Sequence, residues 1–201
     1  MNSQYAQKNN KPPVILASSS VYRRHQLQQL HIDFSHYDAA IDESLVEDES
    51  PKNRALRLAI AKAQSIKKQF PEAVVIGSDQ VCACDNQVYH KPGNRHNNIK
   101  HLTAFSGRTV IFYTAVCVMG LNTQSREYIN ETQVKFRQLS ASEISRYVDK
   151  EQAFDCAGGF KMEQLGLSLM RSVKSDDPSA LMGLPLIQLC AFLRELGVEL
   201  P

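Results

Sequence analysis

A long amphipathic helix, with a proline near each end, dominates this sequence. Ser50 and Pro51 begin it, because serine is a good helix cap and proline favours the first helical position. Apolar residues then recur at helical spacing until Pro71 stops the pattern: Ala55, Leu58, Ala59, Ala63, Ile66 and Phe70. One face of this helix must therefore be buried against another element.

Short apolar segments on both sides of the helix predict the sheet on which it packs. Val14–Ala17 and Ala73–Ile76 are typical of buried strands, and the second ends at the turn-like residues 77–80. Further strands are expected over 34–37, 81–84, 88–89, 110–118 and 127–136, and further helices over about 22–30, up to 105, over 141–148 and over 184–196. The mixture of strands and helices indicates an α/β protein. No repeat or linker divides it, so residues 14–201 are predicted to form a single domain after a flexible lead-in over residues 1–13.

Composition excludes several classes of protein. Hydrophobic residues make up 43% of the chain and charged residues 22%, which is typical of a globular protein and not of a disordered tail. A formal net charge of +2 is small for a protein that binds long nucleic acid, but it leaves small anionic ligands open. The apolar runs are far shorter than the roughly 20 residues of a membrane-spanning helix. With a polar start and five scattered cysteines, we expect a cytoplasmic protein without a membrane partner.

Polar residues follow the first predicted strand, at the edge where ligands collect in open α/β sheets. Residues 18–24 combine hydroxyl groups, helix-start amides and the guanidinium groups of Arg23 and Arg24, all of which suit a phosphate. An ordinary helix cap followed by solvated arginines explains the same residues, and local sequence alone favours this interpretation. The segment is not a P-loop, because the glycine pattern and the Lys-Ser/Thr ending are missing.

Asp79 follows the second predicted strand and is a candidate metal ligand or proton acceptor. A turn-forming aspartate is an equally good interpretation from local sequence. Glu43 lies in an acidic loop, a kind of segment that is usually only solvated. Lys62 lies beside the apolar stripe of the long helix, and Lys91 lies in a proline-containing loop. Together these residues supply the cations, oxygen ligands and base that metal-assisted phosphate chemistry requires.

Several motifs, in order from residue 14 to residue 197, are more specific together than any one alone. They are ILASSSVYRR, Asp42-Glu43, ALRLAIAKA, VIGSDQV, HKPGN, SGRT, DCAGGFKMEQLG and MGLPLIQL. Together they resemble the Maf family of nucleoside triphosphate pyrophosphatases, and SDQV, CAGGFKMEQLG and DDPSALMGLPL resemble its 7-methyl-GTP branch. The resemblance implies a Maf/ITPase-like α/β fold with an elongated mixed sheet, helices and two lobes around a nucleotide-binding cleft. It also implies a divalent cation, Mg²⁺ or Mn²⁺, and a homodimer.

The resemblance assigns roles to single residues. Asp79 matches the family's proton acceptor, Ser18, Arg23, Lys62 and Lys91 match phosphate-binding positions, and Glu43 and Asp79 match metal positions. The positions that select the base correspond to Tyr22, Gln80 and Glu163. Three residues depart from the family pattern: Val21 replaces a proline, Tyr22 replaces the tryptophan expected in the 7-methyl-GTP branch, and Met182 replaces a valine. Of these, Tyr22 bears on base preference.

These assignments predict a hydrolase of acid anhydrides that cleaves 7-methyl-GTP between its α- and β-phosphates, giving 7-methyl-GMP and diphosphate. Water attacks the α-phosphorus with the help of Asp79, while cationic side chains neutralise the triphosphate. An enzyme for dTTP and UTP, or for a damaged purine triphosphate, would use the same chemistry and differ only in its base contacts. A different class is a non-catalytic nucleotide-binding regulator of septum formation, although mere binding does not need a base beside the phosphates.

Overall fold

The computed structural model describes residues 12–121 and 125–201, in which seven strands form one mixed sheet. The strands are β1 (Val14–Ala17), β2 (Phe34–Tyr37), β3 (Val74–Cys84), β4 (Gln87–Tyr89), β5 (Thr109–Met119), β6 (Ser125–Phe136) and β7 (Met170–Lys174). The helices are α1 (Val21–Gln28), α2 (Pro51–Gln69), α3 (Arg95–Phe105), α4 (Ala141–Glu151) and α5 (Leu186–Glu195), with 3₁₀ helices η1 (Ala157–Gly159), η2 (Leu165–Leu169) and η3 (Pro178–Met182). The predicted α/β class is confirmed. Most of the predicted lead-in over residues 1–13 lies outside the described residues.

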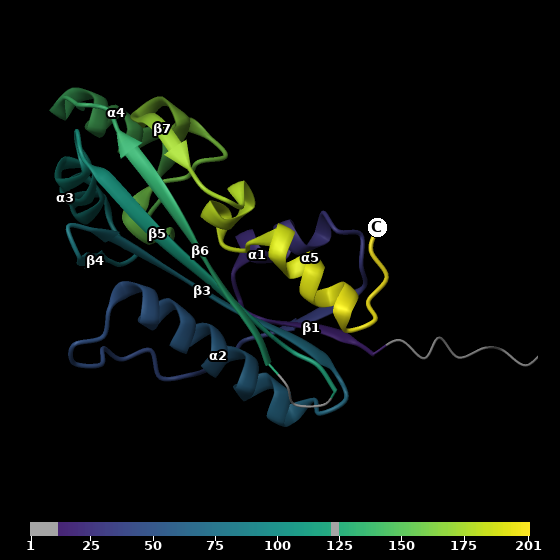
Figure 1. Cartoon of the computed structure of the whole chain (residues 1–201). Coiled ribbons are helices and arrows are strands. Elements are labelled where there is room, and N and C mark those ends of the chain that lie inside the picture. Colours follow the sequence, from purple (N-terminus) through teal and green to yellow (C-terminus); the bar gives the residue numbers. More distant parts are fainter. Residues whose placement is uncertain (1–11, 122–124) are drawn as a thin grey trace, which may run out of the picture.

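Three long strands, β3, β5 and β6, run the length of an elongated molecule (Figure 1). The sheet order is β2-β1-β3-β5-β6-β7, with β4 paired to β3. β1 is parallel to both β2 and β3, while β3, β5, β6 and β7 pair antiparallel in turn. Because β1 is much shorter than β3, one end of β3 continues beyond its parallel neighbour. That free length of β3 lies beside the site described below.

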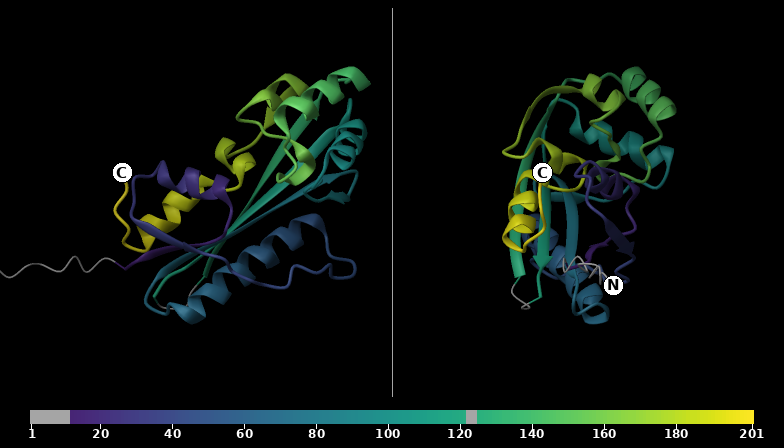
Figure 2. Two further views of the ribbon diagram at one scale, coloured as in Figure 1. Left: turned by 180° about the vertical axis from the view of Figure 1, so that it is seen from behind. Right: turned by 90° about the vertical axis from the view of Figure 1, so that its right-hand side faces the viewer.

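Helices cover both faces of the sheet at one end of the molecule. The predicted long helix is α2, which packs its apolar stripe on one face, and α1 and α5 cover the other (Figures 1 and 2). At the other end, α3 and α4 pack around the ends of β3, β5 and β6. The buried residues Phe105, Phe112, Phe136 and Tyr147 form the centre of this second cluster. The two packed ends are the two predicted lobes.

Local sequence signals set most element boundaries. Ser50 caps α2 by accepting a hydrogen bond from the Asn53 amide, and Ser140 and Glu143 form the predicted capping box of α4. The predicted β3–β4 turn is confirmed at Asp85 and Asn86, which both adopt positive φ angles. β7 was not predicted, since its exposed residues lack an alternating pattern. None of the helices in the described residues is both long and apolar enough to cross a bilayer.

The predicted strand end at Gly77 is wrong, because β3 continues without interruption from Val74 to Cys84. β1 stops where Ala17 pairs with Gly77, but the antiparallel pairing with β5 continues as far as Ala83. The backbone of residues 77–80 therefore keeps a hydrogen-bonding partner and stays extended. Asp79 consequently lies inside a strand, just beyond the carboxyl end of β1, and not in a loop.

Gly77 allows α2 to approach the sheet closely. A Cβ atom at this position would collide with the backbone of α2 at Ala59 O and Ala63 N. We expect Gly77→Ala to lower the free energy of unfolding by about 3 kcal/mol, because neither backbone atom can move away cheaply. Urea denaturation would measure the loss. Gly197→Ala is the matched control: its φ is positive, but no atom lies within 4 Å of the added Cβ, so a smaller loss of about 1 kcal/mol is expected. Equal losses in the two variants would contradict this account of Gly77.

Candidate active site

A cleft of about 730 Å³ lies where the two lobes meet. Its walls come from the end of β1, the start of α1, one side of α2, the middle of β3, the loop after β4, and the segments around η1 and η3. All the site residues predicted from the sequence line it: Ser18, Tyr22, Arg23, Glu43, Lys62, Asp79, Gln80, Lys91 and Glu163. The fold thus brings residues that are distant in the sequence into one cavity, and the most distant of them are Ser18 and Glu163, which are 145 positions apart.

An ion-paired cluster of Lys62, Asp79 and Glu43 forms the centre of the cleft. The Lys62 Nζ atom lies 2.6 Å from Asp79 Oδ1 and 2.8 Å from Glu43 Oε1. The side chains of Lys62 and Asp79 are only 12% and 11% exposed, whereas Glu43 is 54% exposed. Lys62 comes from α2 and Asp79 from β3, so the packing of this helix on this strand creates the pair. Breaking a largely buried ion pair is costly, which keeps both groups in place.

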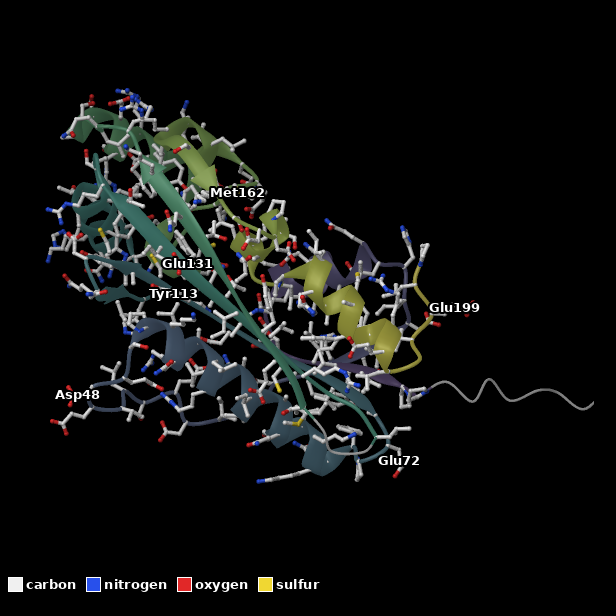
Figure 3. The ribbon with its side chains drawn as sticks, viewed as in Figure 1. Asp48, Glu72, Tyr113, Glu131, Met162 and Glu199 are labelled. Atoms are coloured by element: carbon white, nitrogen blue, oxygen red, sulfur yellow. The ribbon has the colours of Figure 1, made fainter. Side chains whose placement is uncertain are left out.

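Glu43 reaches the cluster because Arg54 holds its loop. Arg54 lies at the start of α2, is buried, and donates from Nη2 to the backbone carbonyl of Glu43 at 2.7 Å. Within the acidic stretch 42–49, Glu43 lines the cleft, while Asp48 points into solvent at the far tip of the loop (Figure 3). Burial opposes ionisation of Glu43, but the hydrogen bond and charge of Lys62 outweigh it and lower the pKa. Glu43 is therefore a carboxylate at neutral pH.

Arg23 adds a second cation beside this cluster. Its Nε atom donates to the carbonyl of Gly183 at 3.0 Å, and its Nη1 atom donates to Ser18 Oγ at 3.3 Å. Gly183 also accepts a hydrogen bond from Ser78 on β3. Burial lowers the pKa of Arg23, while the charges of Asp79 and Glu43 raise it. The guanidinium is thus fixed at one end of the cleft with donors left for a ligand.

Tyr22, Asp155, Lys161 and Glu163 line the other part of the cleft. The Tyr22 hydroxyl donates to the Asp155 carboxylate, at 3.2 Å from Oδ1 and 3.1 Å from Oδ2. The Lys161 Nζ atom lies 5.9 Å from the centroid of the Tyr22 ring. Glu163 is exposed and lines the same wall. This part of the cleft offers an aromatic face and carboxylates.

The side chain of Gln80, which is predicted to select the base, is fixed by contacts within the fold. Its Nε2 atom lies 3.0 Å from Thr114 Oγ1, 3.0 Å from the Ala180 carbonyl and 3.1 Å from the Leu181 carbonyl. Its amide nitrogen therefore ties β3 to β5 and η3. The role of Gln80 in base selection stays a prediction.

Comparison with known families decides the relationship of the chain. Residues 13–196 match the family model described as "Maf-like protein". The chain belongs to the Maf family. It is 46% identical over 190 residues to the 7-methyl-GTP pyrophosphatase of Idiomarina loihiensis, covering 93% of this chain and 96% of that protein. It is 47% identical over 190 residues to the 7-methyl-GTP pyrophosphatase of Xanthomonas axonopodis pv. citri, covering 94% of this chain and all of that protein.

A solved structure shares the fold of this Maf protein. The Staphylococcus aureus Ham1 protein superposes with a TM-score of 0.54 at 14% sequence identity, covering 91% of this chain and 98% of that chain. At this low identity the likeness concerns the fold alone. The expected elongated mixed sheet with helices is confirmed.

Sequence reasoning missed several residues of this Maf cleft. Arg54 is one of several charged residues of α2, and Asp155 and Lys161 lie within the motif DCAGGFKMEQLG, for which the family resemblance assigns a role to Glu163 alone. Their partners are distant in sequence, because Tyr22 and Asp155 are 133 positions apart. No local signal separated Arg54 from the other charged residues of α2, and none pointed to Asp155.

The carboxylates fit the divalent cation that the family resemblance implies. Asp79 and Glu43 both lie within hydrogen-bonding distance of one ammonium nitrogen, so their oxygens already face a single positive charge. Across the described residues, no group of three or more His, Cys, Asp or Glu side chains is arranged to hold a metal. Two carboxylates completed by phosphate oxygens and water are a common set for Mg²⁺. The protein side chains alone therefore offer an incomplete site, which a nucleotide would complete.

Proposed function

We propose that this Maf protein hydrolyses 7-methyl-GTP to 7-methyl-GMP and diphosphate. The observation that carries the proposal is 46–47% identity, over almost the whole chain, to relatives named 7-methyl-GTP pyrophosphatase. The cleft supports it independently, because cations and carboxylates lie together in one part and an aromatic ring lies in another. A nucleoside triphosphate needs both kinds of surface. We further propose that the enzyme acts as a homodimer.

The cationic side chains are assigned to the triphosphate. Arg23, Lys62 and Lys91 line the cleft. The positive charges of Arg23 and Lys91 both help to lower the pKa of Glu43. A triphosphate carries about four negative charges, so three protein cations and one divalent cation roughly balance it. Ser18 orients Arg23 through its hydroxyl group. These contacts would hold the leaving diphosphate as its charge develops.

Asp79 is assigned as the proton acceptor for the attacking water. Without substrate, Asp79 is paired with Lys62 at 2.6 Å, and a triphosphate would compete for the same ammonium group. Movement of Lys62 toward the phosphates frees Asp79 to accept a proton. The water oxygen then bonds to the α-phosphorus, and the bond from that phosphorus to the α–β bridging oxygen breaks. The products are the nucleoside monophosphate and diphosphate.

Glu43 and Asp79 are assigned to the divalent cation, Mg²⁺ or Mn²⁺. When bound, the cation supplies Lewis-acid stabilisation of charge on the phosphate oxygens. Glu43 suits this role because it remains ionised and partly exposed, with Arg54 fixing its backbone. The chain's part is to keep both carboxylates facing the same space.

A substrate panel tests the proposed function. The protein is incubated with 7-methyl-GTP, GTP, dTTP and UTP in the presence of Mg²⁺ or Mn²⁺, and released diphosphate is measured. We expect the highest kcat/KM for 7-methyl-GTP. Preference for dTTP or UTP would overturn the base assignment and leave the chemistry standing. Nucleotide binding without diphosphate release from any substrate would favour the regulator instead.

Lys91→Ala is expected to reduce kcat/KM by about 10²-fold with little change in melting temperature. The loss follows from removing one cation that stabilises the charged transition state. Stability should change little, because Lys91 is exposed and forms no ion pair among the described residues. Lys100→Ala is the matched control, since Lys100 is an exposed lysine of α3 that does not line the cleft. A fall in melting temperature that matches the loss of activity would make Lys91 a structural residue.

A further inference from the structure

Asp155 places an uncompensated negative charge beside the aromatic ring of the cleft. It lies directly before η1 and lines the cleft with Tyr22. Its carboxylate accepts hydrogen bonds from the Tyr22 hydroxyl and, at 3.5 Å, from the Cys156 thiol. Among residues 12–121 and 125–201, no Lys, Arg or His forms an ion pair with it. Asp155 therefore has two neutral donors and a full charge available to a ligand.

The Tyr22 ring is already shown to accommodate a cation. Lys161 places its ammonium group 5.9 Å from the ring centroid, within the range of cation–π attraction. The same ammonium lies 3.7 Å from the buried carboxylate of Glu151, so it keeps an anionic partner if it leaves the ring. A cationic ligand can thus replace Lys161 on the ring face, and Lys161 then still has Glu151 as its partner.

Asp155 strengthens the attraction of the Tyr22 ring for a cation, and it does so through the hydroxyl of Tyr22. Burial raises the pKa of Tyr22, and Cys156 and Asp155 raise it further, so the hydroxyl stays protonated and donates. A phenol that donates to a carboxylate becomes richer in electrons, because hydrogen-bonded groups polarise one another. An electron-rich ring attracts a cation more strongly. The carboxylate and the ring therefore favour the same kind of ligand.

The balance of charge differs between the two parts of the cleft. In the part assigned to the phosphates, the cations Arg23, Lys62 and Lys91 outnumber the carboxylates Glu43 and Asp79. In the part with the aromatic ring, Asp155 and Glu163 outnumber Lys161, which already has Glu151 as its partner. A nucleotide with a neutral base matches only the cationic part. A nucleotide methylated at N7 of guanine carries a positive ring and a negative triphosphate, and so it matches both.

We infer that Asp155 is a specificity-determining residue that, together with Tyr22, selects a positively charged base over a neutral one. The inference rests on the proposed function and adds to it the residue pair that reads the charge of the base. Its contribution is separate from that predicted for Glu163, which makes no hydrogen bond to Tyr22 among the described contacts. The chemistry recognised is the delocalised cation of an N7-alkylated purine.

Asp155→Asn tests the inference, because asparagine keeps a hydrogen-bond acceptor for Tyr22 and removes only the charge. We expect the ratio of kcat/KM for 7-methyl-GTP to that for GTP to fall roughly tenfold, the size of a moderate cation–π and charge effect. Inhibition by 7-methyl-GMP relative to GMP should weaken by a similar factor, which gives a readout that does not depend on turnover. Asp149→Asn is the matched control, since Asp149 is an exposed carboxylate of α4 that pairs with Arg95 outside the cleft.

A second variant keeps the inference falsifiable if Asp155→Asn folds poorly. Tyr22→Phe retains the ring and removes the hydroxyl that donates to Asp155, so the ratio should also fall. In the double variant the two losses should not add, because both break one hydrogen-bonded unit. If wild-type protein does not hydrolyse 7-methyl-GTP, the proposed function fails. If it does, but neither variant changes the ratio, or both substrates lose activity equally, Asp155 does not select the base.

Discussion

Asp79→Asn is expected to abolish diphosphate release while the protein remains folded. The substitution keeps the size and polarity of the side chain but removes the charge that a base or a metal ligand needs. Loss of general-base action alone costs roughly 10²–10⁴ in rate, and a weakened metal site adds to that. The fold should persist because Lys62 keeps its ion pair with Glu43 at 2.8 Å. Initial rates at saturating nucleotide and metal, with a melting curve of the same sample, measure both effects.

Asp85→Asn is the matched control for this prediction. Asp85 lies in the exposed β3–β4 turn with φ at 49°, a conformation that asparagine tolerates well. Its substitution should leave turnover close to that of the wild type. If Asp79→Asn also retained near wild-type turnover, Asp79 would have no part in the mechanism. If it unfolded instead, its pairing with Lys62 would matter chiefly for stability.

The sequence predicts the elements of this fold well wherever the signal is local. Ser50 with Pro51 located the start of α2, and the Ser140 capping box located the start of α4. β3 was predicted to be too short because its continuation depends on β5, where Asp79 pairs with Ala115. A glycine-serine-aspartate run resembles a turn when it is considered alone. Only the distant partner strand shows that it is extended.

The candidate site shows the same division between local and distant information. The family resemblance identified Lys62, Asp79 and Glu43, and the structure brings them into one ion-paired cluster. It did not identify Arg54 or Asp155, whose roles depend on contacts formed only when α2 packs against the acidic loop and η1 lies beside α1. Residue types can suggest chemistry, but the orientation of charges within a cleft comes from tertiary packing.

Glu43→Gln is expected to raise the metal concentration needed for half-maximal activity by at least about tenfold. The amide is a neutral and weaker ligand for a hard divalent cation than the carboxylate that the lowered pKa of Glu43 maintains. At low metal concentration the rate should fall by roughly 10²-fold, on the scale of losses seen when groups that support a metal are altered. Raising Mg²⁺ or Mn²⁺ should restore part of it. Titration of both metals at saturating nucleotide measures the shift.

Glu43 has a second role that the same titration separates from metal binding. Its carboxylate is one of two anions that hold Lys62, so its loss leaves that ammonium paired with Asp79 alone. If this were the main effect of the substitution, Lys62 would bind the proton acceptor more firmly and no amount of metal would restore the rate. Glu47→Gln, in the exposed part of the same loop, controls for general effects of charge removal. Partial rescue by metal, absent from this control, supports ligation. A rate that stays low at every metal concentration, with an unchanged midpoint, would instead assign Glu43 to the positioning of Lys62.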